Sequence, residues 1–171
     1  MPNKKPSLKL AKISSIFQLI TSIIFALLSI VLAIFIIKIL LDISSKENNE
    51  GLQVLSLVII LIILIAVEIF STTLTIFGLS ASIPLIRVCN LSIEEFYSKR
   101  KKAVISNSLG TMQGILISGG GIFLLINYIE HSSSILLLGI PLVLLGLIII
   151  TLSILSFINI NKIKQYIDSN A

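Results

Sequence analysis

The sequence predicts an all-α, polytopic integral membrane protein whose four transmembrane helices form two antiparallel hairpins. Of its 171 residues, 56% are hydrophobic and 12% are charged, whereas a soluble domain carries about 25% charged residues. The apolar residues lie in long blocks, each long enough to supply the roughly 20 apolar residues that span a bilayer. Basic residues collect at the ends of these blocks. So few charges cannot cover a water-facing surface, and we therefore expect a membrane protein.

The first apolar block predicts a span over residues 13–37, after a short basic segment at 1–12. The block exceeds the roughly 7–15 residues of a signal-peptide core, so we expect it to be retained. A polar turn at 42–51 precedes the second span, predicted over 52–77 and extending to 86. Pro84 lacks an N–H and its ring clashes with the carbonyl four residues back. We therefore expect part of the segment before 86 to kink or to leave the membrane.

A basic connector at 87–102 joins the two predicted hairpins. Ser92 and Glu95 have the spacing of a capping box, which predicts a helix that starts at Ser92. This helix is expected to lead without a break into a third span at 103–129. A tight turn precedes the fourth span at 135–158, and the whole chain 1–171 is interpreted as one membrane domain.

The distribution of Lys and Arg predicts the orientation. Four basic residues lie in the N-terminal segment, five in the connector 87–102 and two in the C-terminal tail, against only Lys38 and Lys46 on the opposite side. Cytoplasmic loops carry the excess of basic residues, so both termini and the connector are predicted to be cytoplasmic. We expect a multi-pass protein of the bacterial inner (cell) membrane. The net charge of +5 then reflects topology and does not indicate a nucleic-acid partner.

The chemistry-bearing residues are few. One Cys excludes an intramolecular disulfide and a Cys-based zinc site, and one His excludes a histidine metal cluster within one chain. The scattered carboxylates add no recognisable set of nucleophile and base. We therefore expect no enzyme activity, no catalytic residue, no metal and no cofactor.

Glu68 is the only acidic residue deep inside a predicted span. A charged carboxylate there is costly, so the side chain is expected to be protonated, paired or facing a hydrated cavity. Helical spacing places hydroxyl residues on its face, and folding the first hairpin about a centre near 46 to 47 brings Glu68 beside Phe25. In the same fold, Gln18 opposes Thr75. The predicted intramembrane polar cluster consists of Glu68, Ser71, Thr72, Thr75, Gln18 and Ser22.

Two interpretations of this cluster stay open. In the functional one, Glu68 binds a proton or cation in a transport path. In the structural one, a neutral Glu68 is hydrogen-bonded to Ser and Thr and holds two helices together. We favour the structural interpretation because the sequence offers no second acidic group and no charged partner inside the spans.

Small residues recur along the third and fourth spans at helical spacing. Such ridges let helix backbones approach closely. Folding about a turn near 131 to 132 pairs residues whose numbers add to about 263, so that Gly110 meets Ser153. The Gly-rich run 118–121 could instead mark a broken transporter helix or a phosphate loop, but it lacks the Lys and Ser/Thr of a P-loop and lies within a predicted span. The predicted helix-packing residues are Gly110, Gly114, Ser118, Gly121, Gly139, Gly146 and Ser153.

The basic residues of the connector are interpreted as topology anchors that contact lipid headgroups. Each Lys or Arg near an anionic membrane surface contributes about 1 kcal/mol of binding. The residues concerned are Arg87, Lys99, Arg100, Lys101 and Lys102.

The spans carry ridges of small residues that favour helix packing, and the sequence has no recognisable set of catalytic residues. These two features favour a non-catalytic protein of an accessory, assembly or immunity type, which acts through helix–helix and protein-partner contacts. The expected partners are the lipid bilayer and a membrane protein or a second copy of the chain. The alternative is a small oligomeric transporter or channel subunit that uses the intramembrane carboxylate Glu68.

Overall fold

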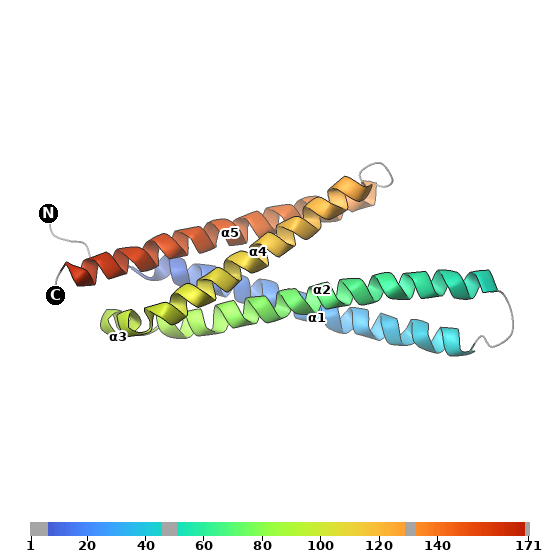
Figure 1. The fold of residues 1–171 in the computed structure, drawn as a ribbon, viewed down its shortest axis with the longest axis horizontal. Helices are drawn as coiled ribbons and strands as arrows, with labels where there is room; N and C mark the ends of the chain where they lie inside the picture. The colour runs from blue at the N-terminus through green and yellow to red at the C-terminus, as the bar shows by residue number, and fades with distance from the viewer. Residues whose placement is uncertain (1–6, 46–50, 129–132, 170–171) are drawn as a thin grey trace. The chain divides into compact units, whose positions relative to one another are not determined.

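The computed structural model describes residues 7–45, 51–128 and 133–169, and every regular element in these ranges is helical. Five helices follow one another in the chain (Figure 1): α1 (Lys9–Ser45), α2 (Gly51–Cys89), α3 (Ile93–Ser98), α4 (Arg100–Tyr128) and α5 (Ser133–Asp168).

Four of these helices are long and apolar enough to cross a membrane. The candidate spans within the described residues are Lys9–Leu41, Leu55–Cys89, Arg100–Ile126 and Gly139–Asp168. The all-helical, four-span prediction is thus confirmed at the level of length and composition. The helices are longer than the predicted spans because polar residues at their ends continue the backbone hydrogen bonding beyond the apolar segment.

Pro84 does not end α2. The helix continues past it to Cys89, so no separate segment leaves α2 before residue 86. Helices in membranes tolerate proline where neighbouring groups satisfy the freed carbonyl.

The connector contains the predicted cap and also an unexpected break. Ser92 has extended backbone angles, and its side-chain oxygen accepts a hydrogen bond from the N–H of Glu95 at 3.3 Å, which confirms the start of a helix there. The prediction of an unbroken helix into the third span is wrong. Lys99 adopts φ −102° and ψ 8°, its N–H bonds to the carbonyls of Glu95 and Phe96, and α4 begins only at Arg100.

The chain divides into two compact units. The first comprises Met1–Thr21 and Phe77–Ala171, and the second comprises Ser22–Ile76. The first unit has a buried cluster that draws on all five helices: Ala11, Leu85, Val88, Cys89, Phe96, Ala103, Ile160 and Ile163. Phe96 of the short α3 is fully buried in this cluster.

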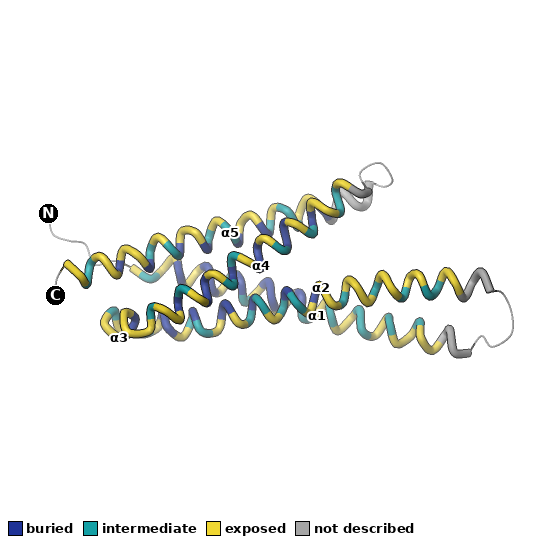
Figure 2. The backbone as a smooth tube through the Cα atoms, in the orientation of Figure 1, coloured by how far each residue is buried: buried dark blue, intermediate teal, exposed yellow. Residues whose placement is uncertain are grey.

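Large apolar side chains are exposed along the four long helices. Ile24, Ile62 and Phe123, for example, are 59, 61 and 63% exposed. Figure 2 shows exposed positions recurring along each long helix between buried or intermediate ones. Contiguous apolar surface of this extent is rare on a soluble monomer, and it fits side chains that face lipid.

Candidate functional site

Polar side chains gather in three places. We call them the Glu68 cluster, on α1 and α2; the glycine seam, between α4 and α5; and the basic pocket, between the end of α2 and the start of α4. No group of three or more His, Cys, Asp or Glu side chains among the described residues is placed to hold a metal ion.

The Glu68 cluster lies within the second unit. Ser29 Oγ donates to Glu68 Oε1 at 2.6 Å, and Thr72 Oγ1 donates to the same oxygen at 3.3 Å. The two hydroxyls are themselves 2.9 Å apart. Glu68 Oε2 is buried and has no hydrogen-bond partner in the part of the chain that the structure describes. One carboxyl oxygen therefore joins the helices, while the other is left without a donor.

The register of α1 against α2 differs from the predicted one by about one turn. Glu68 faces Ser29, not Phe25, and it is Ser71 Oγ that donates to the carbonyl of Phe25, at 2.9 Å. The predicted centre was 46 to 47, but the facing helix ends, Ser45 and Gly51, are centred on position 48. The sum of two paired residue numbers is twice the centre of the hairpin. A shift of the centre by about one to two residues therefore moves the pairing by about two to four residues, which is close to one helical turn.

The remaining predicted members of the cluster are distributed differently. Thr75 Oγ1 donates to the carbonyl of Ser71 in its own helix at 3.0 Å, and Ser22 is fully buried in the second unit. Gln18 belongs to the first unit, where its Nε2 donates to Ser153 Oγ at 3.0 Å. Gln18 therefore serves the glycine seam.

The glycine seam brings the backbones of α4 and α5 close together. A Cβ atom at Gly114 would lie 3.0 Å from the carbonyl oxygen of Gly146, and one at Gly121 would lie 2.9 Å from that of Gly139. A Cβ at Gly146 would collide with the hydroxyl of Ser118. These contacts use the small residues that the sequence singled out, with paired numbers close to the predicted sum.

One end of the seam contains a side chain that the prediction did not place there. The side-chain amide of Gln18 occupies the space that a Cβ at Gly110 would need, and the same amide donates to Ser153 Oγ. Asn107 Nδ2 donates to the carbonyl oxygen of Ser153 at 2.8 Å. The seam is thus a three-helix contact in which amide side chains from α1 and α4 converge on Ser153. A Gln within an apolar span indicates a hydrogen bond to another helix. The sequence alone did not show that Gly110 leaves the space for the Gln18 side chain.

The basic residues of the connector are not equivalent. Lys99, Lys102 and Arg87 line the basic pocket, a cavity of about 550 Å³. Lys101 is exposed and does not line it. Arg100 is turned to α5, where its Nη2 donates to Asn161 Oδ1 at 3.3 Å. Of the four consecutive cations, Lys99 and Lys102 therefore line the pocket, Arg100 contacts α5, and Lys101 does neither.

The short α3 is also tied to the C-terminal end of α5. Tyr97 OH donates to Asp168 Oδ1 at 2.9 Å. This hydrogen bond, assisted by the negative charge of Asp168, raises the pKa of Tyr97 above its ordinary value.

No protein-family model, curated protein or solved structure matches this chain.

Proposed function

We propose that this is a non-catalytic integral membrane protein of an accessory, assembly or immunity type, which acts through helix–helix contacts with a membrane-protein partner or a second copy. We place it as two antiparallel hairpins with both termini cytoplasmic, in a bacterial inner membrane. The orientation is supported by the excess of basic residues in 1–12, 87–102 and the C-terminal tail. The second hairpin is supported by the α4–α5 contacts, in which residue numbers rise along one helix as they fall along the other.

The observation that carries the proposal is the use of small and polar side chains inside the apolar helices. Gln18, Asn107 and Ser153 are buried and hydrogen-bonded across helices, and the glycines of the seam permit backbone contact. Without a hydrophobic driving force between helices in lipid, close packing and interhelical hydrogen bonds are what hold such helices together. The spans are thus built for helix association.

A further glycine offers a place for a partner helix. Gly119 lies on an exposed face of α4 beside Ile115 and Ile122, which are 56 and 47% exposed. A Cβ built at Gly119 would meet no atom within 4 Å. Unlike Gly114 and Gly121, this residue is not used for packing against α5, so its face is open to close approach by another helix.

Photo-crosslinking in the native membrane tests the proposal. A photoreactive residue at Ile115 or Ile122 is expected to yield one discrete adduct with a second polypeptide, whose mass distinguishes a copy of the chain from another membrane protein. The matched position is Leu147, an exposed residue of α5, which is expected to label lipid. Lipid adducts alone at all three positions, from a protein that also purifies as a solitary monomer, would contradict the proposal.

A small oligomeric transporter or channel subunit is the second candidate, favoured by one observation. Glu68 Oε2 is buried in an apolar stretch without a donor among the described residues, and an acceptor in that state can hold a proton or a cation. Ionisable residues inside spans commonly mark transport paths. Four helices enclose little aqueous space, so this function requires a homo-oligomer.

Flux measurements in liposomes separate the two functions. Glu68→Gln retains an oxygen that accepts the Ser29 hydrogen bond, so the variant should still fold, but it cannot exchange a proton. The transporter hypothesis predicts pH-dependent flux that this variant abolishes. Wild-type liposomes without flux, or equal flux from the variant, would remove that hypothesis and leave the first proposal in place.

A further inference from the structure

The basic pocket gathers three of the connector's cationic residues around one cavity, an arrangement that the positive-inside bias alone does not require. It lies within the first unit, between the last three turns of α2 and the start of α4. Its volume of about 550 Å³ falls in the range of small-molecule sites, roughly 300–1,000 Å³. Three cationic residues line it, and no acidic residue is among the described residues that do so.

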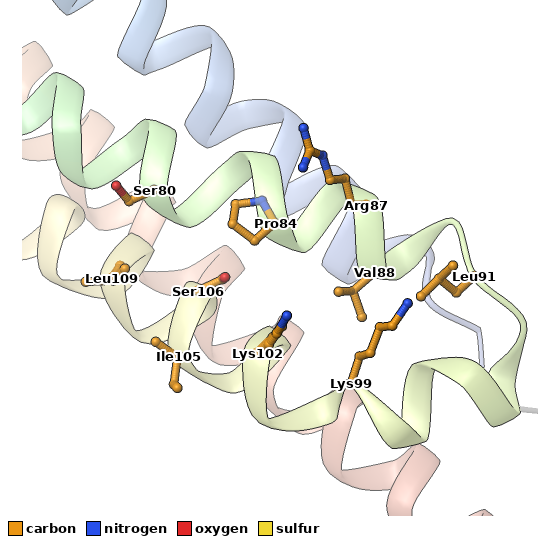
Figure 3. Close-up of a pocket in the computed structure, with 10 residues that line it drawn as sticks. All are labelled: Ser80, Pro84, Arg87, Val88, Leu91, Lys99, Lys102, Ile105, Ser106 and Leu109. Atoms are coloured by element: carbon orange, nitrogen blue, oxygen red, sulfur yellow. The ribbon is translucent and has the colours of Figure 1, made fainter.

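The charged residues of the pocket lie at one end of it along the helices. Lys99 and Lys102 lie at the start of α4, and Figure 3 shows both side chains directed toward α2, near Pro84 and Val88. In the same view the guanidinium of Arg87 extends away from the two ammonium groups. Farther along α4, the wall consists of Ile105, Leu109 and the hydroxyl of Ser106. The three cations therefore lie toward the helix ends, beside Val88 and Leu91, and the described lining toward the middle of the spans is uncharged.

We propose that the basic pocket binds one anionic phospholipid, with its phosphate between Lys99 and Lys102 and the start of an acyl chain against Ile105, Leu109 and Pro84. Basic pockets between transmembrane helices are recognised sites for anionic headgroups. The ammonium groups supply the charge and the hydrogen-bond donors that a phosphate oxygen requires. The pocket lies where two candidate spans end, which is the depth at which a lipid carries its phosphate.

A lipid fits this pocket better than a soluble phosphate ester. A phosphate alone would use the two ammonium groups but would leave the apolar wall of Ile105 and Leu109 uncovered. A lipid covers both parts with one molecule. A phospholipid and a soluble phosphate ester both present a phosphate ester anion, so the experiment must distinguish these two ligands.

Neighbouring lysines provide a matched pair of variants. Lys101 and Lys102 are adjacent and both are exposed, but only Lys102 lines the pocket. Lys101→Gln and Lys102→Gln remove the same charge from the same helical turn. A difference between them therefore reports the pocket and not the general attraction of a basic segment to an anionic membrane.

The test is native mass spectrometry of the full-length, delipidated protein in detergent, titrated with dioctanoyl phosphatidylglycerol. One adduct is expected, with weaker binding of dioctanoyl phosphatidylcholine. Lys99→Gln and Lys102→Gln should each weaken the phosphatidylglycerol adduct about fivefold. Lys101→Gln should leave it within about twofold, as expected for an exposed charge outside the site. Lys102→Arg keeps the positive charge and should retain the adduct. Retention in this variant would show that the loss in Lys102→Gln comes from the missing charge and not from misfolding.

Three results would overturn the proposal. Equal losses in Lys101→Gln and Lys102→Gln would show diffuse attraction without a site. Equal binding of the two lipids would exclude recognition of the anionic headgroup. Displacement of the lipid by an equimolar concentration of glycerol 3-phosphate would assign the pocket to a soluble phosphate ester. None of these results bears on the crosslinks expected at Ile115 and Ile122.

Discussion

At Gly146 a single methyl group would lie 2.6 Å from the carbonyl oxygen of Gly114 and would collide with the hydroxyl of Ser118. Backbone atoms cannot move aside as a flexible side chain can. A hydrogen atom at this position is therefore what allows α4 and α5 to approach each other. The same substitution at Gly119, outside the seam, meets open space, so the two glycines differ in their surroundings although they look alike in sequence.

Gly146→Ala is accordingly expected to destabilise the protein by about 1–3 kcal/mol, the usual cost of overpacking. Gly119→Ala should be neutral or slightly stabilising, because Ala has the higher helix propensity. Reversible unfolding in mixed micelles measures both. Equal stability of the two variants would show that the backbones of α4 and α5 are not in contact at Gly146.

At the scale of elements, the six-residue α3 is positioned by its two ends and one side chain. Ser92 caps its start, Lys99 ends it, and Phe96 is buried among residues of the four long helices. The sequence indicated the cap, since Ser92 and Glu95 have the required spacing. It did not indicate the break at Lys99, because the need to bury Phe96 arises only once the other helices are assembled.

Phe96→Ala is expected to cost about 3–5 kcal/mol, as for other buried aromatic residues truncated to alanine. The loss should be local first, because α3 has no other fully buried side chain among its residues. Hydrogen exchange of the amides in 93–98 is the appropriate measurement. Glu94→Ala, at an exposed position of the same helix, is the control and should leave exchange nearly unchanged.

The contact between α3 and the end of α5 should depend on pH. The hydrogen bond to Asp168 stabilises the neutral form of Tyr97 and raises its pKa above the ordinary value. Because the pKa in the folded state is raised, the contact contributes fully below the ordinary tyrosine value of about 10. Its contribution is lost as the pH rises through the raised pKa, where tyrosinate and carboxylate repel each other.

The difference in tyrosinate absorbance between wild type and Tyr97→Phe isolates this titration. Its midpoint should lie above that of free tyrosine, and Asp168→Ala should return it toward the ordinary value. A midpoint at the ordinary value in the wild type would mean that the hydrogen bond is not formed in solution. The side chains are exposed, so the effect on global stability should be small.

At the scale of the whole molecule, membrane orientation follows from charge and not from packing. Eleven of the thirteen Lys and Arg lie in the segment 1–12, the connector 87–102 and the C-terminal tail. Reporter fusions at both termini and within the connector are therefore expected to lie on the cytoplasmic side. Reporters placed at 42–51 or 130–134 should lie on the other side. Termini on opposite sides would contradict the four-span topology.

The sequence by itself determined the helical class, the four candidate spans, the cap at Ser92 and the small residues of the seam. These features depend on local properties: hydrophobicity, helical periodicity and the hydrogen bonding of one turn. Only the tertiary structure decided the partner of Glu68, the placement of Gln18 against Gly110 and the separation of Lys102 from Lys101. The physical reason is that a shift of one turn in register leaves hydrophobicity and periodicity almost unchanged, yet it replaces every facing side chain. Register is decided by the collisions and hydrogen bonds of the assembled helices.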